Sequence, residues 1–246
     1  MSSEWVEWMR QYGEDSHQAR RLRFVQEAIR AALDRAPPGP IRVLSLCAGD
    51  GRDLLGVLAD HPRARDVRAR LIDLTPEFVA AGRAGARALG LHTIEFVLGD
   101  ASVAASAEGA VPADLLLLCG IFGNVSDRDI RATAHHAPEL CAAGATVVWT
   151  RGRFPPDLTP SIREWFRDAG FEELAFVAVP DSTASVGSGR LVAPPRPFDR
   201  AVRLFTFLPD AERPASRARA AGLGPAGPAG AVATATDASD AGPRGT

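Results

Sequence analysis

One stretch of the sequence constrains the fold more than any other: Ile41–Leu58, which reads IRVLSLCAGDGRDLLGVL. Four of its first six residues are apolar and partly β-branched, which predicts a short strand buried on both faces. Gly49 and Gly51 follow, and they permit a backbone path and a close approach that side chains would block. Leucines then recur at helical spacing. A strand, a glycine turn and a helix in this order aim backbone N–H groups at whatever lies above the turn, so we predict a nucleotide-type binding site.

Apolar strand patterns alternate with helical patterns along most of the chain. Strands are predicted at Ile41–Leu46, Val67–Leu74, Thr93–Leu98, Ala113–Cys119, Ala145–Thr150, Phe171–Val179 and Val202–Leu208. Helices are predicted at about His17–Leu33, Thr75–Leu89, Ser126–Ala143 and Leu158–Ala169, besides the one that follows the glycine turn. This alternation predicts an α/β fold with a doubly wound, seven-stranded, mostly parallel sheet. The last two strands have only a glycine- and proline-containing loop between them and are expected to pair antiparallel at one edge.

The sequence divides into three parts. Residues 1–40 are predicted to be helical, and a run of prolines ends this segment. Residues 41–209 carry the alternating pattern of the α/β domain. Residues 210–246 are rich in Ala, Gly and Pro and contain almost no large apolar side chain, so they are expected to be disordered.

The composition excludes several classes of protein. The 246-residue chain has 28 basic residues of the Lys and Arg types, and every one of them is arginine. An enzyme that forms a Schiff base needs a lysine amine, and a P-loop NTPase needs a Gly-Lys-Ser/Thr sequence, so both classes are excluded. The formal net charge of −2 argues against a surface that coats nucleic acid.

The chain is expected to be a cytoplasmic protein without a membrane segment or a metal site. Its N-terminus lacks the basic start and apolar run of a signal peptide, and its most apolar run, Leu115–Phe122, is too short to span a bilayer. The three cysteines, Cys47, Cys119 and Cys141, are odd in number and widely spaced, so we expect reduced, buried thiols.

Acidic and small residues recur where the predicted strands end. Asp73 ends the second strand, 22 residues after Gly51, and a carboxylate there can accept hydrogen bonds from both ribose hydroxyls. Asp100 follows the third strand, where it can accept from an exocyclic amine while the next backbone N–H meets an adenine ring nitrogen. Gly120 follows the fourth strand. Ligands of open α/β sheets bind at these carboxyl ends, so the three positions are expected to share one site.

These motifs resemble those of the class I S-adenosylmethionine-dependent methyltransferases, and the resemblance covers about residues 41–208. The first motif of that family is an acidic residue followed by three glycines at alternate positions. Here Ser45 stands at the acidic position, Cys47 at the first glycine, and Gly49 and Gly51 at the other two. The resemblance implies a Rossmann-like methyltransferase fold and S-adenosylmethionine as cofactor. The implied cofactor-binding residues are Ser45, Cys47, Ala48, Gly49, Gly51, Asp73, Leu74, Asp100, Ala101 and Gly120.

The first motif departs from the family at the residue that helps to hold the methionine amine. Ser45 carries no charge, and Asp53 or the backbone could take over this contact. Two other readings stay open. One is an NAD(P)-dependent oxidoreductase, although Leu54 stands where the third glycine of Gly-x-Gly-x-x-Gly belongs and two aspartates would face the pyrophosphate. The other is a non-catalytic module that binds an adenosine nucleoside.

Substrate contacts are predicted on both sides of this cofactor site. In the family the N-terminal helices often form a lid, so residues 1–40 are expected to cover the cofactor, with Trp5 and Tyr12 against the substrate. Further candidates are Phe122, Asn124 and Arg151, which follow or end the fourth and fifth strands. Methyl transfer is an in-line displacement that requires alignment rather than an acid–base triad. No nucleic-acid methylase motif is present, so we expect a small-molecule substrate, and the sequence leaves the oligomeric state open.

Overall fold

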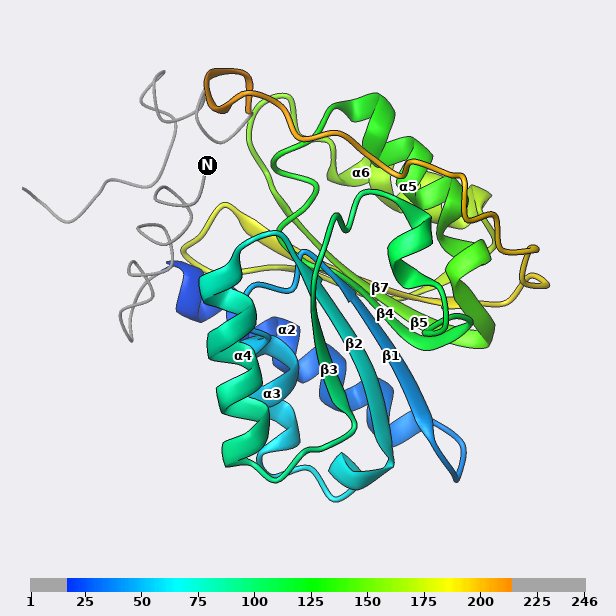
Figure 1. Ribbon diagram of the computed structural model, residues 1–246. Coiled ribbons are helices and arrows are strands. Elements are labelled where there is room, and N and C mark those ends of the chain that lie inside the picture. Colours follow the sequence, from blue (N-terminus) through cyan, green and yellow to red (C-terminus); the bar gives the residue numbers. More distant parts are fainter. Residues whose placement is uncertain (1–16, 214–246) are drawn as a thin grey trace, which may run out of the picture.

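Seven strands form one sheet in the computed structural model, which describes residues 17–213 (Figure 1). The strands are β1 (Ile41–Leu46), β2 (Val67–Asp73), β3 (Ile94–Leu98), β4 (Ala113–Leu118), β5 (Cys141–Gly152), β6 (Phe171–Ala178) and β7 (Ala184–Leu191). The α-helices are α2 (His17–Arg35), α3 (Arg52–Leu58), α4 (Pro76–Ala88), α5 (Asp127–Leu140) and α6 (Thr159–Asp168). Short 3₁₀ turns are η1 (Ala64–Asp66), η2 (Ala104–Ala107) and η3 (Asp210–Glu212).

The strand order is β3-β2-β1-β4-β5-β7-β6, and every pair up to β5 is parallel. Strand β7 runs antiparallel to both β5 and β6. The order reverses at β1, so the loops that follow β1 and β4 leave neighbouring strands in opposite directions. In an open α/β sheet this is where a ligand binds. The predicted fold, a doubly wound and mostly parallel sheet of seven strands, is confirmed.

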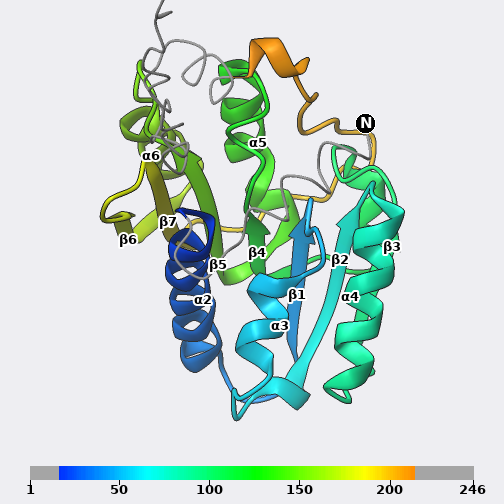
Figure 2. The same ribbon diagram turned by 90° about the vertical axis from the view of Figure 1, so that its left-hand side faces the viewer.

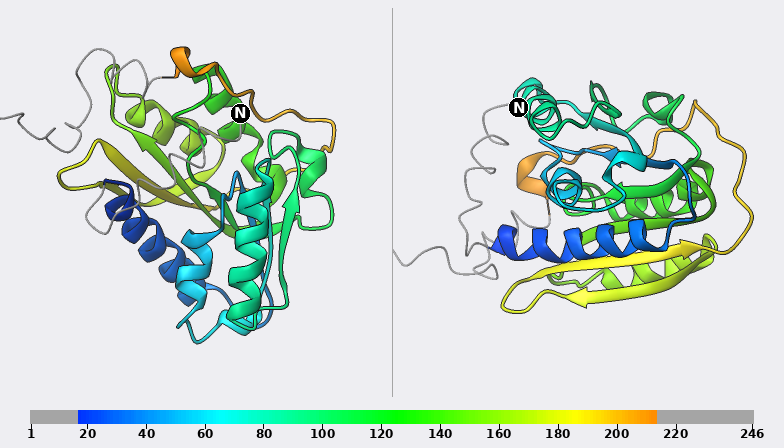
Figure 3. Two further views of the ribbon diagram at one scale, coloured as in Figure 1. Left: turned by 60° about the vertical axis from the view of Figure 1, so that its left-hand side comes forward. Right: turned by 90° about the horizontal axis from the view of Figure 1, so that it is seen from below.

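Helices cover both faces of the sheet. One core lies between the sheet and α2, α3 and α4, and the other lies between the sheet and α5 and α6 (Figure 2). Helix α2 packs on α3 and along β7, as the view from below shows (Figure 3). Because α2 runs antiparallel to β1, its N-terminal end lies at the level of the strands' carboxyl ends.

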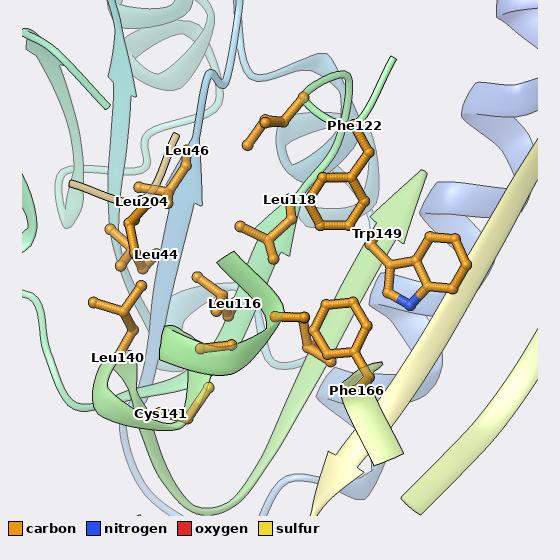
Figure 4. Close-up of a cluster of buried hydrophobic side chains, with 14 of the residues drawn as sticks. Leu44, Leu46, Leu116, Leu118, Phe122, Leu140, Cys141, Trp149, Phe166 and Leu204 are labelled. Carbon is orange, nitrogen blue, oxygen red and sulfur yellow. The ribbon is translucent and has the colours of Figure 1, made fainter. Parts of the chain in front are cut away.

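An aromatic cluster fills the core under α6. The rings of Phe122 and Trp149 have centroids 6.2 Å apart, and Phe122 lies at the same distance from Phe166 (Figure 4). Trp149 stacks on Phe166 with an interplanar angle of 11°. This packing fixes the ends of β4 and β5 relative to each other, and those ends carry part of the candidate site.

The prediction that Val202–Leu208 forms the seventh strand is wrong. The seventh strand is Ala184–Leu191, which falls in the stretch predicted to be a glycine- and proline-containing loop. A Cβ added at Gly187 would lie 2.2 Å from the Trp149 ring. A Cβ added at Gly189 would lie 3.3 Å from the Glu172 carbonyl oxygen. The glycines therefore belong to a strand that passes between bulky neighbours, and a single-sequence pattern carries no sign of those neighbours.

Residues 202–208 are extended but lie outside the sheet. Their backbone meets the loops that follow β3 and β4: the Leu204 N–H donates to the Ser102 carbonyl at 2.7 Å, and the Leu208 N–H donates to the Asn124 carbonyl at 2.8 Å. Leu204 is buried. This strap, residues 202–208, thereby ties together two loops at the carboxyl edge of the sheet.

The boundary between α5 and β5 also differs from the prediction. The helix ends at Leu140 and the strand begins at Cys141, four residues earlier than expected. Cys141 pairs with Ala113, and the register is irregular before the next pair. Gly144 has a φ of 75° within this irregularity, so a bulge hides the beginning of the strand from a periodicity search.

Candidate functional site

The turn between β1 and α3 alternates left-handed residues. Cys47, Gly49 and Gly51 have φ angles of 56°, 58° and 71°. The three positions are those that the family fills with glycine, so Cys47 adopts the glycine conformation despite its side chain. Gly51 precedes the first residue of α3 and is its N-cap.

Asp73, at the end of β2, holds this turn. One carboxylate oxygen accepts the Gly49 N–H at 2.8 Å, and the other accepts the Thr75 N–H at 2.9 Å. Each oxygen of a carboxylate has a further lone pair, so both can still accept from a ligand. The side chain is mostly buried, which strengthens such bonds.

The glycines of the turn have different surroundings. A Cβ added at Gly51 would lie 2.6 Å from both Leu71 and Phe96, so this glycine permits close packing of α3 on β2 and β3. A Cβ added at Gly49 would meet nothing within 4 Å. Gly49 therefore faces open space above the turn, where a ligand can approach the backbone.

Asp100 lies beside the turn, after β3. Its carboxylate accepts the Ser102 N–H at 2.9 Å and lies 3.5 Å from the guanidinium of Arg203, which belongs to the strap. Burial raises the pKa of Asp100, but the bonds from Ser102 and the charge of Arg203 outweigh it and leave the pKa below its ordinary value. Asp100 is therefore an anion at neutral pH and half-exposed. Ala101, the neighbouring candidate, is buried.

Gly120 is the last of the cofactor-binding candidates along the chain. Its φ is 81°, and its N–H donates to the Thr150 hydroxyl at 2.9 Å. A Cβ added at Gly120 would meet nothing within 4 Å. The Asn124 amide donates to the Gly120 carbonyl at 2.6 Å, which closes the loop after β4. Asn124 thus shapes this loop, and its predicted substrate contact stays a prediction.

Negative charge gathers around the turn. Asp50 is neutralised by Arg52, whose guanidinium lies 2.6 Å from it. Burial, together with the charges of Asp73 and Asp100, raises the pKa of the Cys47 thiol well above its ordinary value. A cation that binds above the turn is favoured by the same two carboxylates.

Asp53 and Arg21 form a second charged group on the α2 side of the sheet. Burial raises the pKa of Asp53 to about 6, and the Leu54 N–H at 2.8 Å and the charge of Arg21 offset only part of this rise. Both charges also act on Cys119, at the end of β4. The sequence suggests Asp53 only as a substitute for Ser45, and it predicts a solvated helix face for Arg21. A basic residue one helix away from an acidic turn gives no signal in a single sequence.

The remaining candidates for cofactor and substrate contacts differ in their surroundings. Ser45 is buried within β1, and Ala48 and the exposed side chain of Leu74 flank the turn and Asp73. Phe122 has no exposed surface and belongs to the aromatic core, and its predicted substrate contact stays a prediction. Trp5 and Tyr12 lie outside the described residues.

Arg151 is the fifth substrate candidate. It is placed at the carboxyl end of β5, and only 3% of it is exposed.

Other features of residues 17–213 lie away from this edge. A surface hollow of about 570 Å³ opens at Gly170 and Phe171, at the opposite edge of the sheet. No three His, Cys, Asp or Glu side chains in the described range come close enough together to hold a metal ion. No helix in that range has both the length and the apolar character that crossing a bilayer requires.

The sheet order, the reversed β7 and the left-handed turn before α3 define a Rossmann-like methyltransferase fold. Residues 13–161 match the model of a family described as "Putative methyltransferase". This match covers more than half of the chain, so the chain belongs to this methyltransferase family. None of the curated proteins compared with the chain matches it.

Three solved structures are similar to the chain. An O-methyltransferase family protein from Burkholderia thailandensis is 23% identical with a TM-score of 0.55, over 69% of this chain and 54% of that one. Magnesium protoporphyrin IX methyltransferase from Synechocystis PCC 6803, with bound SAM, is 13% identical with a TM-score of 0.60, over 77% and 91%. The 1,6-didemethyltoxoflavin-N1-methyltransferase from Burkholderia thailandensis, with bound 1,6-didemethyltoxoflavin and S-adenosylhomocysteine, is 18% identical with a TM-score of 0.55, over 70% and 79%. At these identities the similarity establishes the fold, and the chain spans about half the length of the first protein.

Proposed function

We propose that this protein transfers a methyl group from S-adenosylmethionine to a small molecule. The observation that carries the proposal is the turn between β1 and α3, where three left-handed residues alternate and Asp73 holds the central one, Gly49, by its N–H. The methyltransferase family of the chain and the bound ligands of the two similar methyltransferases from Synechocystis and Burkholderia support it.

The residues on the adenosine side fit the cofactor. The carboxylate of Asp73 keeps lone pairs for two ribose hydroxyls, and Asp100 offers an exposed acceptor for an exocyclic amine. Leu74, with 54% of its surface exposed, supplies an apolar face directly after Asp73. Gly49 leaves its backbone open to the ligand.

On the methionine side of the cofactor, the residues differ from those that the family uses. Ser45 is buried and uncharged, whereas Asp53 supplies a carboxylate close to Arg21. A carboxylate and a guanidinium together complement the ammonium and the carboxylate of an amino acid. We therefore assign the contact with the methionine amine to Asp53.

The cofactor, when bound, supplies the activated methyl group. The chain aligns and desolvates the reactants. The backbone of the turn between β1 and α3 fixes the cofactor. Gly120 leaves space beside the loop after β4, and Asn124 holds that loop closed. No described side chain is required as a general base if the acceptor is already nucleophilic. The acidic surroundings suit a sulfonium better than the pyrophosphate of NAD(P), which disfavours an oxidoreductase.

The domain division is part of the same proposal. Residues 41–209 bind the cofactor, residues 1–40 form the lid and residues 210–246 are a tail. The position of the N-terminal end of α2 at the carboxyl edge of the sheet supports this division. We also propose a cytoplasmic location for the protein.

Calorimetry with S-adenosylmethionine, S-adenosylhomocysteine and NADH tests the function. Micromolar binding of the two adenosyl compounds, without binding of NADH, is expected. Binding of NADH alone would refute the proposal. A panel of small nucleophiles, scored by mass for a gain of one methyl group, then separates an enzyme from an inert binder, because an inert binder leaves every acceptor unmodified.

A further inference from the structure

Arg151 is a buried cation whose hydrogen-bonding capacity is not met by the described residues. Only 3% of its surface is exposed, and neither its Nε nor its Nη1 has a hydrogen-bond partner within residues 17–213. Desolvated donors of a charged group cost free energy unless a partner restores their bonds. Most buried guanidinium groups in proteins are therefore paired, and this one requires an explanation.

The position of Arg151 places it at the functional edge of the sheet. It is the residue before the last in β5, and it lies on the face that also carries Val147 and Trp149, toward α5 and α6. A Cβ added at Gly123, in the loop after β4, would lie 4.0 Å from the Nη1 atom. A side chain at position 123 would therefore contact the guanidinium, and the glycine leaves this side of it without one, three residues from Gly120.

Two carboxylates act on Arg151 from a distance. Asp127 begins α5, and Asp157 lies two residues before the start of α6 and accepts the Thr159 N–H at 2.9 Å. Burial lowers the pKa of Arg151, and the charges of Asp127 and Asp157 offset only part of this effect. Neither carboxylate forms an ion pair with Arg151 in the described structure. The N-termini of α5 and α6 themselves favour an anion in the same region.

We propose that Arg151 binds an oxyanion, a carboxylate or phosphate group, of the methyl acceptor, on the side of the guanidinium that faces Gly123. This inference rests on the proposed function for the identity of the ligand as a substrate. The unpartnered Nη1, on this side, can donate to one oxygen of such a group in a charge-assisted hydrogen bond, whereas Nε lies on another edge of the planar guanidinium. The methyl acceptor is then an acidic small molecule whose anionic group is held at β5 while its nucleophile faces the loop 120–124.

The test uses the full chain and simple anions as probes: acetate, benzoate and phosphate, compared with chloride at constant ionic strength. Saturable binding is followed by the midpoint of thermal unfolding and by calorimetry. The wild-type protein and R153Q are expected to be stabilised by an oxyanion. Arg153 is the control because it is the next arginine along the chain, directly after β5. Its Nη2 donates to the Ser182 carbonyl at 2.7 Å, and only its Nε lacks a partner among residues 17–213. R151Q is expected to lose at least about tenfold in affinity for the probe, as a charge-assisted pair predicts.

Two further measurements, on G123A and on the binding of S-adenosylhomocysteine, separate the anion site from the proposed function. G123A retains the guanidinium and places a methyl group in contact with its Nη1, so it should weaken probe binding even if R151Q fails to fold. Equal stabilisation of wild type, R151Q and G123A, or no saturable effect of any oxyanion, would overturn the proposal and leave Arg151 as a structural residue in the field of Asp127 and Asp157. The order of affinity among the three probes distinguishes a carboxylate from a phosphate.

Binding of S-adenosylhomocysteine, measured in parallel, should be unchanged in R151Q. Its absence in the wild type would refute the proposed function without deciding the anion site.

Discussion

The backbone N–H of Gly49 donates to the carboxylate of Asp73, with the nitrogen and oxygen 2.8 Å apart. Gly49 belongs to the turn after β1, and Asp73 ends the neighbouring strand, 24 residues later in the chain. One side chain thus fixes the turn, and in the proposed function it also presents acceptors to the cofactor. Loss of Asp73 is expected to affect both the fold and ligand binding.

Replacement of Asp73 by alanine is expected to weaken the binding of S-adenosylhomocysteine by about 1–3 kcal/mol, because hydrogen bonds to a buried charged group are lost. Calorimetry measures this change. D73N keeps one oxygen acceptor and should lie between wild type and D73A. Asp60 provides the control, since its ion pair with Arg30 is exposed and D60A should leave the affinity unchanged. Unchanged affinity in D73A would show that the ribose does not bind at the end of β2.

The affinity for S-adenosylhomocysteine is expected to fall as the pH is lowered through about 6. The cause is Asp53, whose pKa burial raises to about 6, because only the ionised carboxylate attracts the ammonium group of the ligand. Below that pH the affinity should decrease by up to about tenfold per pH unit, and binding should take protons off the protein. Calorimetry in two buffers of different ionisation enthalpy measures both effects. D53N should bind more weakly at pH 8 and show no such dependence; a persisting dependence would assign the titration to another group.

The same carboxyl group affects stability in a defined direction. The pKa of Asp53 is higher in the folded state than in the unfolded chain, so its contribution to stability is fully present below about pH 4 and is lost as the pH rises through about 6. D53N should therefore gain stability relative to wild type between pH 4 and pH 7. Urea unfolding across this range measures the difference.

Glycine is predicted to be more stabilising than alanine at position 47. Its φ of 56° lies in the left-handed region, where a Cβ costs about 1–2 kcal/mol. C47G should exceed C47A in unfolding free energy by about 1 kcal/mol, although glycine is ordinarily less stabilising than alanine. The neighbouring Ala48 supplies the control, because A48G should lower stability by about 0.4–1 kcal/mol. If C47A proved the more stable, the conformation of the turn in solution would differ from the one described.

A methyl group at Gly187 is predicted to disrupt the packing of β7 on β5. The added Cβ would lie 2.2 Å from the ring of Trp149, so G187A should lose about 1–3 kcal/mol or more in unfolding free energy. At Gly99 the nearest side chain is Val97 at 3.6 Å, an ordinary contact. G99A should therefore keep the stability of the wild type. Trp149 fluorescence during urea unfolding reports on both variants.

Much of the fold could be predicted because its signals are local. The buried strand at 41–46, the glycine turn and the helix α4 after Asp73 each follow from apolar periodicity and turn residues within a short window. The alternation of strands and helices then limits the sheet to a mostly parallel, doubly wound form. Asp73 and Asp100 could be expected at one edge because parallel strands end there.

Tertiary structure decided the features that depend on distant neighbours. Strand β7 is assembled from glycine and serine because Trp149 fills the space beside Gly187, whereas the more apolar residues 202–208 became a strap. Phe122 entered the core, although its place after β4 suggested a substrate contact. The sequence by itself determined which residue types stand at the ends of which strands. The packing of the sheet and helices determined that Nε and Nη1 of Arg151 are buried without a hydrogen-bond partner among residues 17–213, and that Asp53 has a raised pKa. Burial and Coulomb interactions arise only when separate elements come together.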